Sequence, residues 1–233
     1  MTPWDTVALS VFFACWLGFE PILQRMGRKS GSIIQDMSVL RLSWMIEMAR
    51  RDSRIIDNQV LGNVLHTTTF LTSSNIILMA AIAGVVFHRG EGQDMSAIAA
   101  GISGGFSLFQ MKLGLVILCL GRGFLDYIWA LKQFNYCVVA IASVPEKIDN
   151  LRRDLLALAL NQVLSPAMKH FSQGIRAYYF ALAAAAWVIG PLPFLLMTLT
   201  FMLLLAWRQM YSGAASGLHE FHRILEDAPA RDE

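Results

Sequence analysis

Four long apolar runs alternate with polar and charged stretches along the chain. The runs lie near residues 4–23, 67–87, 106–144 and 177–207. A helix needs about 20 apolar residues to cross about 30 Å of hydrocarbon, because each residue adds about 1.5 Å. Each run reaches that length. The pattern predicts an all-α polytopic membrane bundle of about four transmembrane helices, in one domain over residues 1–212, with a polar C-terminal tail over residues 213–233.

The last run, residues 177–207, is too long for one straight crossing, since a helix of that length measures about 46 Å. Gly190, Pro191 and Pro193 interrupt it. The run therefore forms either one kinked, tilted span or a tight hairpin of two short helices. We favour the kinked span, because each half is short for an independent crossing.

Two amphipathic stretches, both expected at the cytoplasmic side, lie between the apolar runs. The first carries an apolar stripe at helical spacing: Ile33, Met37, Leu40, Trp44 and Met48. The second begins after Pro145, and Ser165-Pro166 marks a break or a new helix start within it. Such helices lie in the headgroup plane or dock against other helices, and both interpretations stay open.

Composition agrees with a membrane location. Hydrophobic residues make up 55% of the 233 residues, charged residues make up only 15%, and the mean hydropathy is +0.49. A soluble domain is about 25% charged. The net charge of +2 gives no electrostatic basis for nucleic-acid binding. Cys15, Cys119 and Cys137 lie in apolar runs without CxxC spacing, which predicts packing roles and neither a disulfide nor a metal site.

Basic residues predict the orientation. The stretches after the first and third runs are rich in Lys and Arg, whereas the stretch after the second run has only Arg89 before Lys112. The positive-inside rule places both basic stretches in the cytoplasm. With four spans, both termini then lie outside. A hairpin at residues 190–193 would instead bring the C-terminus inside.

Two opposite charges lie inside the third run. Arg122 and Asp126 are four residues apart, so they share one helix face, one turn apart. A lone charge at bilayer depth costs about 3 kcal/mol or more, and a neighbouring opposite charge lowers that cost. Gly121 and Gly123 flank Arg122 and allow another helix to approach closely. The pair is either a structural ion pair at a helix interface or the lining of an ion or substrate path, unless Arg122 lies nearer the headgroups.

A second polar group lies toward the cytoplasmic end of the same run. It consists of Lys132, Gln133, Asn135 and Tyr136. In one interpretation the group is an interfacial belt, in which the lysine snorkels to the headgroups and the tyrosine anchors the helix. In the other it lines a polar vestibule.

The first half of the second run is unusually polar for a membrane span. Its polar residues include Thr69, Ser73, Ser74 and Asn75. In lipid, such groups form hydrogen bonds across helices. We therefore expect this half to face protein or water.

The densest charge cluster precedes the second run. Its members are Arg41, Arg50, Arg51, Arg54 and Asp57. One interpretation is a cytoplasmic collar that binds anionic headgroups. The other is pairing with Asp149 and Asp154 of the second amphipathic stretch, although surface pairs alone contribute little to stability.

The sequence lacks the common enzyme signatures. It has no HExxH, GxSxG, P-loop or Rossmann glycine string. The histidines are scattered, and the pair His219 and His222 shares a face in a stretch that we expect to fray. We expect no enzymatic activity, no metal and no cofactor.

Several strings resemble one known family: "RLSWMIEMARRDSRIIDNQ", "FLTSSNIIL", "WALKQFNYCVVAIASVP" and "RAYYFALAAAAWVIGPLPF". They are similar to the bacterial and plant membrane proteins of the domain of unknown function 599 family, over nearly the whole chain. The resemblance implies an integral membrane protein of about four helices, here of the bacterial inner membrane, and it implies no activity. This chain has Lys132 where the family favours arginine, so a positive charge matters there more than a guanidinium fork.

Two functions follow from these observations. The favoured one is a structural or accessory subunit that assembles with itself or with a larger membrane complex. The alternative is an oligomeric small channel or transporter that uses the polar residues of the second run and the charges of the third. No ion-coordinating filter string supports the alternative. Both functions require protein contacts within the bilayer.

Overall fold

The computed structural model describes residues 2–30, 33–88, 108–145, 149–211 and 213–227, and side chains are described for these residues except 20, 22–30, 33–36, 88, 210–211, 213–215, 219 and 225–227. Every regular element in this part of the chain is a helix, which confirms the all-α class. The helices are α1 (Pro3–Ser30), α2 (Ile33–Arg50), α3 (Ile55–His88), α5 (Leu108–Ala142), α6 (Asn150–Ala186), α7 (Pro191–Tyr211) and α8 (Gly213–Asp227).

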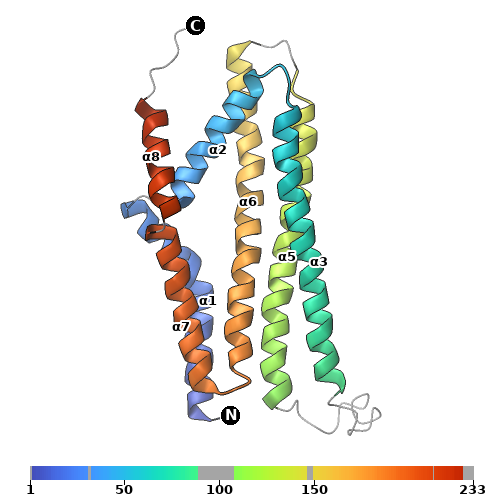
Figure 1. The fold of residues 1–233 in the computed structure, drawn as a ribbon, viewed down its shortest axis with the longest axis vertical. Coiled ribbons are helices and arrows are strands. Elements are labelled where there is room, and N and C mark those ends of the chain that lie inside the picture. The colour runs from blue at the N-terminus through green and yellow to red at the C-terminus, as the bar shows by residue number, and fades with distance from the viewer. Residues whose placement is uncertain (1, 31–32, 89–107, 146–148, 212, 228–233) are drawn as a thin grey trace.

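The helices form an elongated bundle in which α6 is central. On one side α5 packs against α6, and α3 packs against α5 (Figure 1). On the other side α7 packs against both α6 and α1. The helix α2 crosses the bundle obliquely and contacts α6 and α8 (Figure 1). The first amphipathic stretch therefore docks against helices.

Three of the described helices are long and apolar enough to cross a membrane. They cover Ile55–Phe87, Leu108–Ala142 and Pro191–Gln209. The apolar part of α1 is shorter and covers Pro3–Phe19. The prediction of a helical membrane protein is confirmed.

The expected single kinked span over residues 177–207 is wrong. The helix α6 ends at Ala186, a short turn follows, and α7 begins at Pro191 and runs back along α6 (Figure 1). Proline suits the first helical position, where its missing N–H has no partner to lose. The sequence favours the kinked span because each half of the run is short for a separate crossing. The first half is instead the end of the long helix α6, which begins at Asn150, so it does not have to form a helix alone.

Two further expectations need correction. Pro166 does not break the second amphipathic stretch, because α6 continues through it. Its neighbours Leu164 and Ala167 are buried in the packed core, and this packing overrides the low helix propensity of proline. The expected polar tail forms a helix over Gly213–Asp227, which packs against α2.

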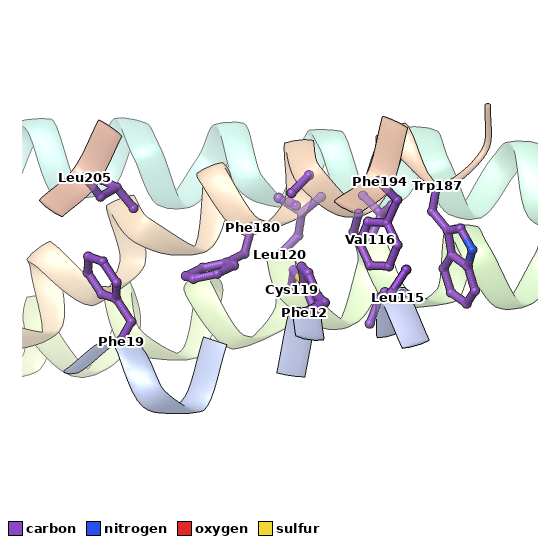
Figure 2. Packing of buried hydrophobic residues seen from close by; sticks show 14 residues of the cluster. Phe12, Phe19, Leu115, Val116, Cys119, Leu120, Phe180, Trp187, Phe194 and Leu205 are labelled. Carbon is purple, nitrogen blue, oxygen red and sulfur yellow. The ribbon is translucent and has the colours of Figure 1, made fainter. Parts of the chain in front are cut away.

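Two apolar clusters hold the bundle together. The first joins α1, α5, α6 and α7 around Phe12, whose ring centroid lies 5.1 Å from that of Phe194 and 5.8 Å from that of Phe180 (Figure 2). The second joins α2, α3, α5 and α6 around Phe134 and Leu164. Fully burying such a side chain contributes about 1.5–3 kcal/mol in water, but in lipid the close contacts themselves supply most of the stabilisation.

A buried aspartate fixes the first turn of α1. Asp5 Oδ1 accepts a hydrogen bond from Trp187 Nε1 at 2.9 Å, and Oδ2 accepts bonds from the N–H and the hydroxyl of Thr2. The Nζ of Lys112 lies 5.7 Å from the Trp187 ring centroid. These contacts join the start of α1, the α6–α7 turn and the start of α5 at one end of the bundle.

Trp187→Phe is expected to lower the free energy of unfolding by about 1–3 kcal/mol, because it leaves Asp5 Oδ1 buried without its donor. Thermal unfolding in mild detergent measures the change. Trp207→Phe is the matched control, since Trp207 is exposed, and a surface change of this kind shifts stability by less than about 0.5 kcal/mol. Equal effects of the two variants would contradict the proposed role of the Asp5 contact.

Candidate functional site

Two glycines bring α5 and α6 into close contact. A Cβ atom added at Gly123 would lie 2.7 Å from Ala177 Cβ, and one added at Gly174 would lie 2.5 Å from the ring of Tyr127. Any larger residue at either position would push the helices apart. The glycines therefore place the polar residues of the two helices within hydrogen-bonding distance.

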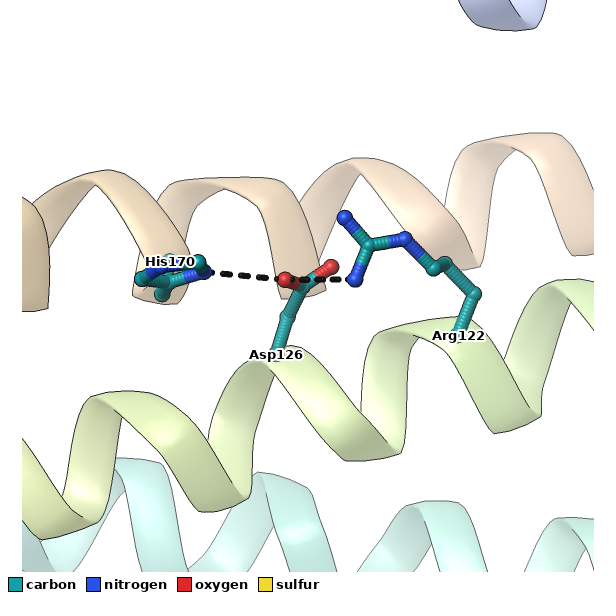
Figure 3. Close-up of polar contacts among 3 residues, drawn as sticks. All are labelled: Arg122, Asp126 and His170. Carbon is teal, nitrogen blue, oxygen red and sulfur yellow. Dashed lines mark hydrogen bonds and ion pairs between the residues drawn. The ribbon is translucent and has the colours of Figure 1, made fainter.

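Asp126 is the centre of a three-residue cluster at this interface. Its Oδ1 lies 2.9 Å from Arg122 Nη1 and 3.0 Å from His170 Nδ1 (Figure 3). The Asp126 side chain is only 3% exposed, whereas that of Arg122 is 51% exposed. With Asp126 ionised, Nδ1 of His170 carries the proton that it donates, because a carboxylate only accepts. The sequence predicted the two residues on α5 and missed His170.

An open pocket of about 370 Å³ adjoins this cluster. It lies between α1, α5 and α6. Its lining residues are Phe13, Trp16, Leu17, Phe19, Arg122, Asp126, Gln173, Arg176, Ala177 and Phe180. The pocket reaches the surface at Leu17 and Arg122, which are both exposed. Its volume is typical of a small-molecule site.

The lining is divided between an aromatic side and a charged side. The helix α1 supplies Phe13, Trp16 and Phe19, which face the charged residues of α5 and α6. The charged side has two guanidinium groups and one carboxylate, and the carboxylate already accepts from Arg122 and His170. The Arg176 guanidinium lies 5.7 Å from the Phe19 ring centroid. The arrangement provides positive charge beside an apolar wall.

The described residues contain no group of three or more His, Cys, Asp or Glu side chains that could hold a metal ion. The side chains that line the pocket supply charge, hydrogen-bonding groups and apolar surface.

The polar half of α3 is divided between two environments. Asn75 is buried and donates from Nδ2 to the Leu120 carbonyl at 3.1 Å. Ser74 is half-buried and donates its hydroxyl to the Phe70 carbonyl of its own helix. Thr69 and Ser73 are exposed, so within this chain other helices cover only the face with Asn75.

The cluster before α3 forms a corner between helices. Asp57 is buried and accepts from Trp44 Nε1 at 2.7 Å and from Arg51 Nη1 at 2.9 Å. Arg54 donates to the Val144 carbonyl, at the end of α5. These contacts give Arg51 and Arg54 structural roles.

The two remaining arginines of this cluster, Arg50 and Arg41, differ in their surroundings. Arg50 is exposed and lies 3.8 Å from Glu47 and 4.0 Å from Asp154, so one expected pairing is present at the distance limit. Asp149 instead pairs with Arg152, 3.4 Å away near the start of α6. Arg41 is half-buried, and burial lowers the pKa of its guanidinium, which stays charged at neutral pH.

The polar group near the end of α5 faces outward. Lys132, Asn135 and Tyr136 are exposed, and Gln133 is half-buried. The Nζ of Lys132 lies 5.2 Å from the Trp129 ring centroid and 5.9 Å from that of Tyr136. Exposed aromatic and basic side chains in contact are typical of a membrane interface.

Comparisons with known proteins agree with the resemblance in the sequence. The family described as "Protein of unknown function, DUF599" matches residues 7–214. The comparisons with curated proteins and with solved structures gave no match. The matched region contains Arg122, Asp126 and His170 and all the residues that line the pocket. The chain belongs to the DUF599 family.

Proposed function

We propose that this protein is a ligand-binding protein of the bacterial inner membrane that takes up an anionic ligand in the pocket between α1, α5 and α6. The observation that carries the proposal is Arg122, a half-exposed arginine that opens onto this pocket from a helix long and apolar enough to cross a membrane. The role belongs to the channel or transporter class and involves no enzymatic step.

The position of Arg122 makes an anion the favoured ligand. Arg122 lies three residues from Leu125, the midpoint of α5, which is about 4.5 Å along the helix axis. A charge at that depth is costly unless it is paired. Asp126 uses the same oxygen, Oδ1, to accept from both partners, and the Arg122 side chain is half-exposed and lines the pocket.

The thermal unfolding temperature of the purified protein is expected to be several degrees higher in inorganic phosphate than in chloride of equal ionic strength. The reason is that a bound anion stabilises only the folded state. Arg122→Gln should abolish this difference. Arg208→Gln is the control, since Arg208 is exposed near the end of α7 and away from the pocket lining. A phosphate effect that survives in Arg122→Gln would refute the proposal.

A structural or accessory role is a second candidate, and the exposed face of α3 favours it. Thr69 and Ser73 are exposed on a helix that can cross a membrane, where polar groups favour contact with another helix. This face would join two copies of the chain or join the chain to a larger complex. Loss of a detergent-stable oligomer in Thr69→Leu/Ser73→Leu, with unchanged folding, would support this role.

The proposed location places the basic stretches around α2 and the start of α6 in the cytoplasm, where Arg50 and Arg152 would contact anionic headgroups. In a cysteine-free background, an impermeant thiol reagent should label Gln93→Cys in intact cells and leave Arg152→Cys unlabelled until the membrane is opened. Because α7 returns along α6, this topology puts α8 in the cytoplasm too. Labelling of Arg152→Cys in intact cells, with Gln93→Cys protected, would show that the chain has the opposite orientation in the membrane.

A further inference from the structure

We propose that the ligand of this pocket is an anionic amphiphile from the bilayer, whose head contacts Arg122 and whose acyl chain lies along the aromatic wall of α1. This inference rests on the proposed anion-binding function and adds the class of ligand. In this proposal the charged side of the pocket binds the head and the aromatic side binds the chain.

The aromatic side of the pocket argues for an apolar chain on the ligand. Phe13, Trp16, Leu17 and Phe19 come from about two turns of α1, and Phe180 adds a further ring from α6. A small hydrated anion would gain nothing from these rings. An acyl chain placed against them would gain apolar contact while its head reaches the arginine.

The open side of the pocket argues for entry from the bilayer. Leu17 lines the pocket and is 74% exposed, so the apolar wall continues onto the outer surface of α1. The volume of about 370 Å³ suits a head and the first part of a chain. The remaining chain would lie along α1 among the lipids.

The charged side argues for a single anionic head. Arg122 and Arg176 supply planar donors that suit a phosphate or a carboxylate, and Gln173 also lines the pocket. A zwitterionic head would bring a second positive charge toward these guanidinium groups. The pocket should therefore select anionic lipids over phosphatidylcholine.

The test uses the full chain in phosphatidylcholine nanodiscs that contain lipid with brominated acyl chains, which quench nearby tryptophan fluorescence. At equal mole fraction, brominated phosphatidylglycerol should quench more than brominated phosphatidylcholine, and the excess should saturate. Trp16→Phe should remove at least half of the excess, because Trp16 lines the pocket. Arg122→Gln should also remove the excess, and Arg122→Lys, which keeps the charge, should retain part of it. Trp207→Phe and Arg208→Gln should keep it.

The outcomes separate this inference from the proposed function. If phosphate stabilises the protein through Arg122 but phosphatidylglycerol gives no excess quenching, the pocket binds a soluble anion and the amphiphile inference is wrong. If neither probe depends on Arg122, both proposals are wrong. An excess that persists in Trp16→Phe would place the lipid elsewhere on the protein and would also overturn the inference. The conservative Arg122→Lys variant keeps the test decisive if Arg122→Gln fails to fold.

Discussion

Asp126→Leu is expected to lower the free energy of unfolding by about 2–4 kcal/mol, because it leaves both Arg122 and His170 without the carboxylate that they contact. The expected loss is below that of a fully buried pair, since the Arg122 side chain is half-exposed and can turn toward the pocket opening. Arg122→Leu should cost about 1–3 kcal/mol, because His170 stays as a donor to the buried Asp126. Chemical or thermal unfolding in mild detergent gives both values.

The double variant Arg122→Leu/Asp126→Leu should be less destabilised than the sum of the single variants, with a coupling energy of about 1–3 kcal/mol. The control is the same double-mutant cycle on Glu220 and Arg223 of α8. Arg223 Nη2 lies 2.6 Å from Glu220 Oε1, and both side chains are exposed. Such surface pairs couple by less than about 1 kcal/mol. Additive effects of the Arg122 and Asp126 substitutions would mean that the two residues do not interact.

The same double variant distinguishes a structural pair from a binding site. If the pair only stabilises the helix interface, folded yield and phosphate binding should recover together. If Arg122 holds the ligand, as proposed, the yield should recover while the phosphate-dependent stabilisation remains absent. The stability cycle thus tests the cluster, and the binding readout tests its function.

The features that the sequence predicted well are local ones. The positions of Arg122 and Asp126 follow from helical spacing alone, because residues four apart on a helix are neighbours wherever the helix packs. The apolar runs near residues 67–87 and 106–144 likewise identified α3 and α5. Both inferences depend only on residues that are close together in the sequence.

The features that the sequence missed depend on contacts between distant segments. His170 lies 44 residues from Asp126, and Trp187 lies 182 residues from Asp5. No periodic pattern links such positions. The environments of Thr69 and Asn75 differ for the same reason, since the rotation of α3 about its axis depends on the Asn75 contact with Leu120 and on the hydrogen bond from the Tyr178 hydroxyl to the Leu71 carbonyl. Local polarity indicated that a contact exists but did not indicate which residue makes it.

The second large effect on stability is expected from adding a methyl group where α5 and α6 pack closely. Gly174→Ala should lower the free energy of unfolding by about 1–3 kcal/mol, because the new methyl group would overlap the fully buried Tyr127 ring. Gly114→Ala on α5 is the matched control. Nothing lies within 4 Å of a Cβ atom at Gly114, so this change should be neutral or stabilise the helix by up to about 1 kcal/mol. His170 is one turn from Gly174, and a shift of α6 there should weaken phosphate binding as well.

A methyl exchange at the neighbouring contact tests whether close packing is the cause. Gly123→Ala alone should destabilise the protein by about 1–3 kcal/mol, because its Cβ would lie 2.7 Å from that of Ala177. Gly123→Ala/Ala177→Gly moves the methyl group from one helix to the other and leaves the summed helix propensity of the pair unchanged. The double variant should therefore recover most of the unfolding temperature lost in Gly123→Ala. If it is instead as unstable as the sum of its two single changes, the cost of Gly123→Ala does not come from the approach of α5 to α6, and the position of His170 beside Asp126 would need another explanation.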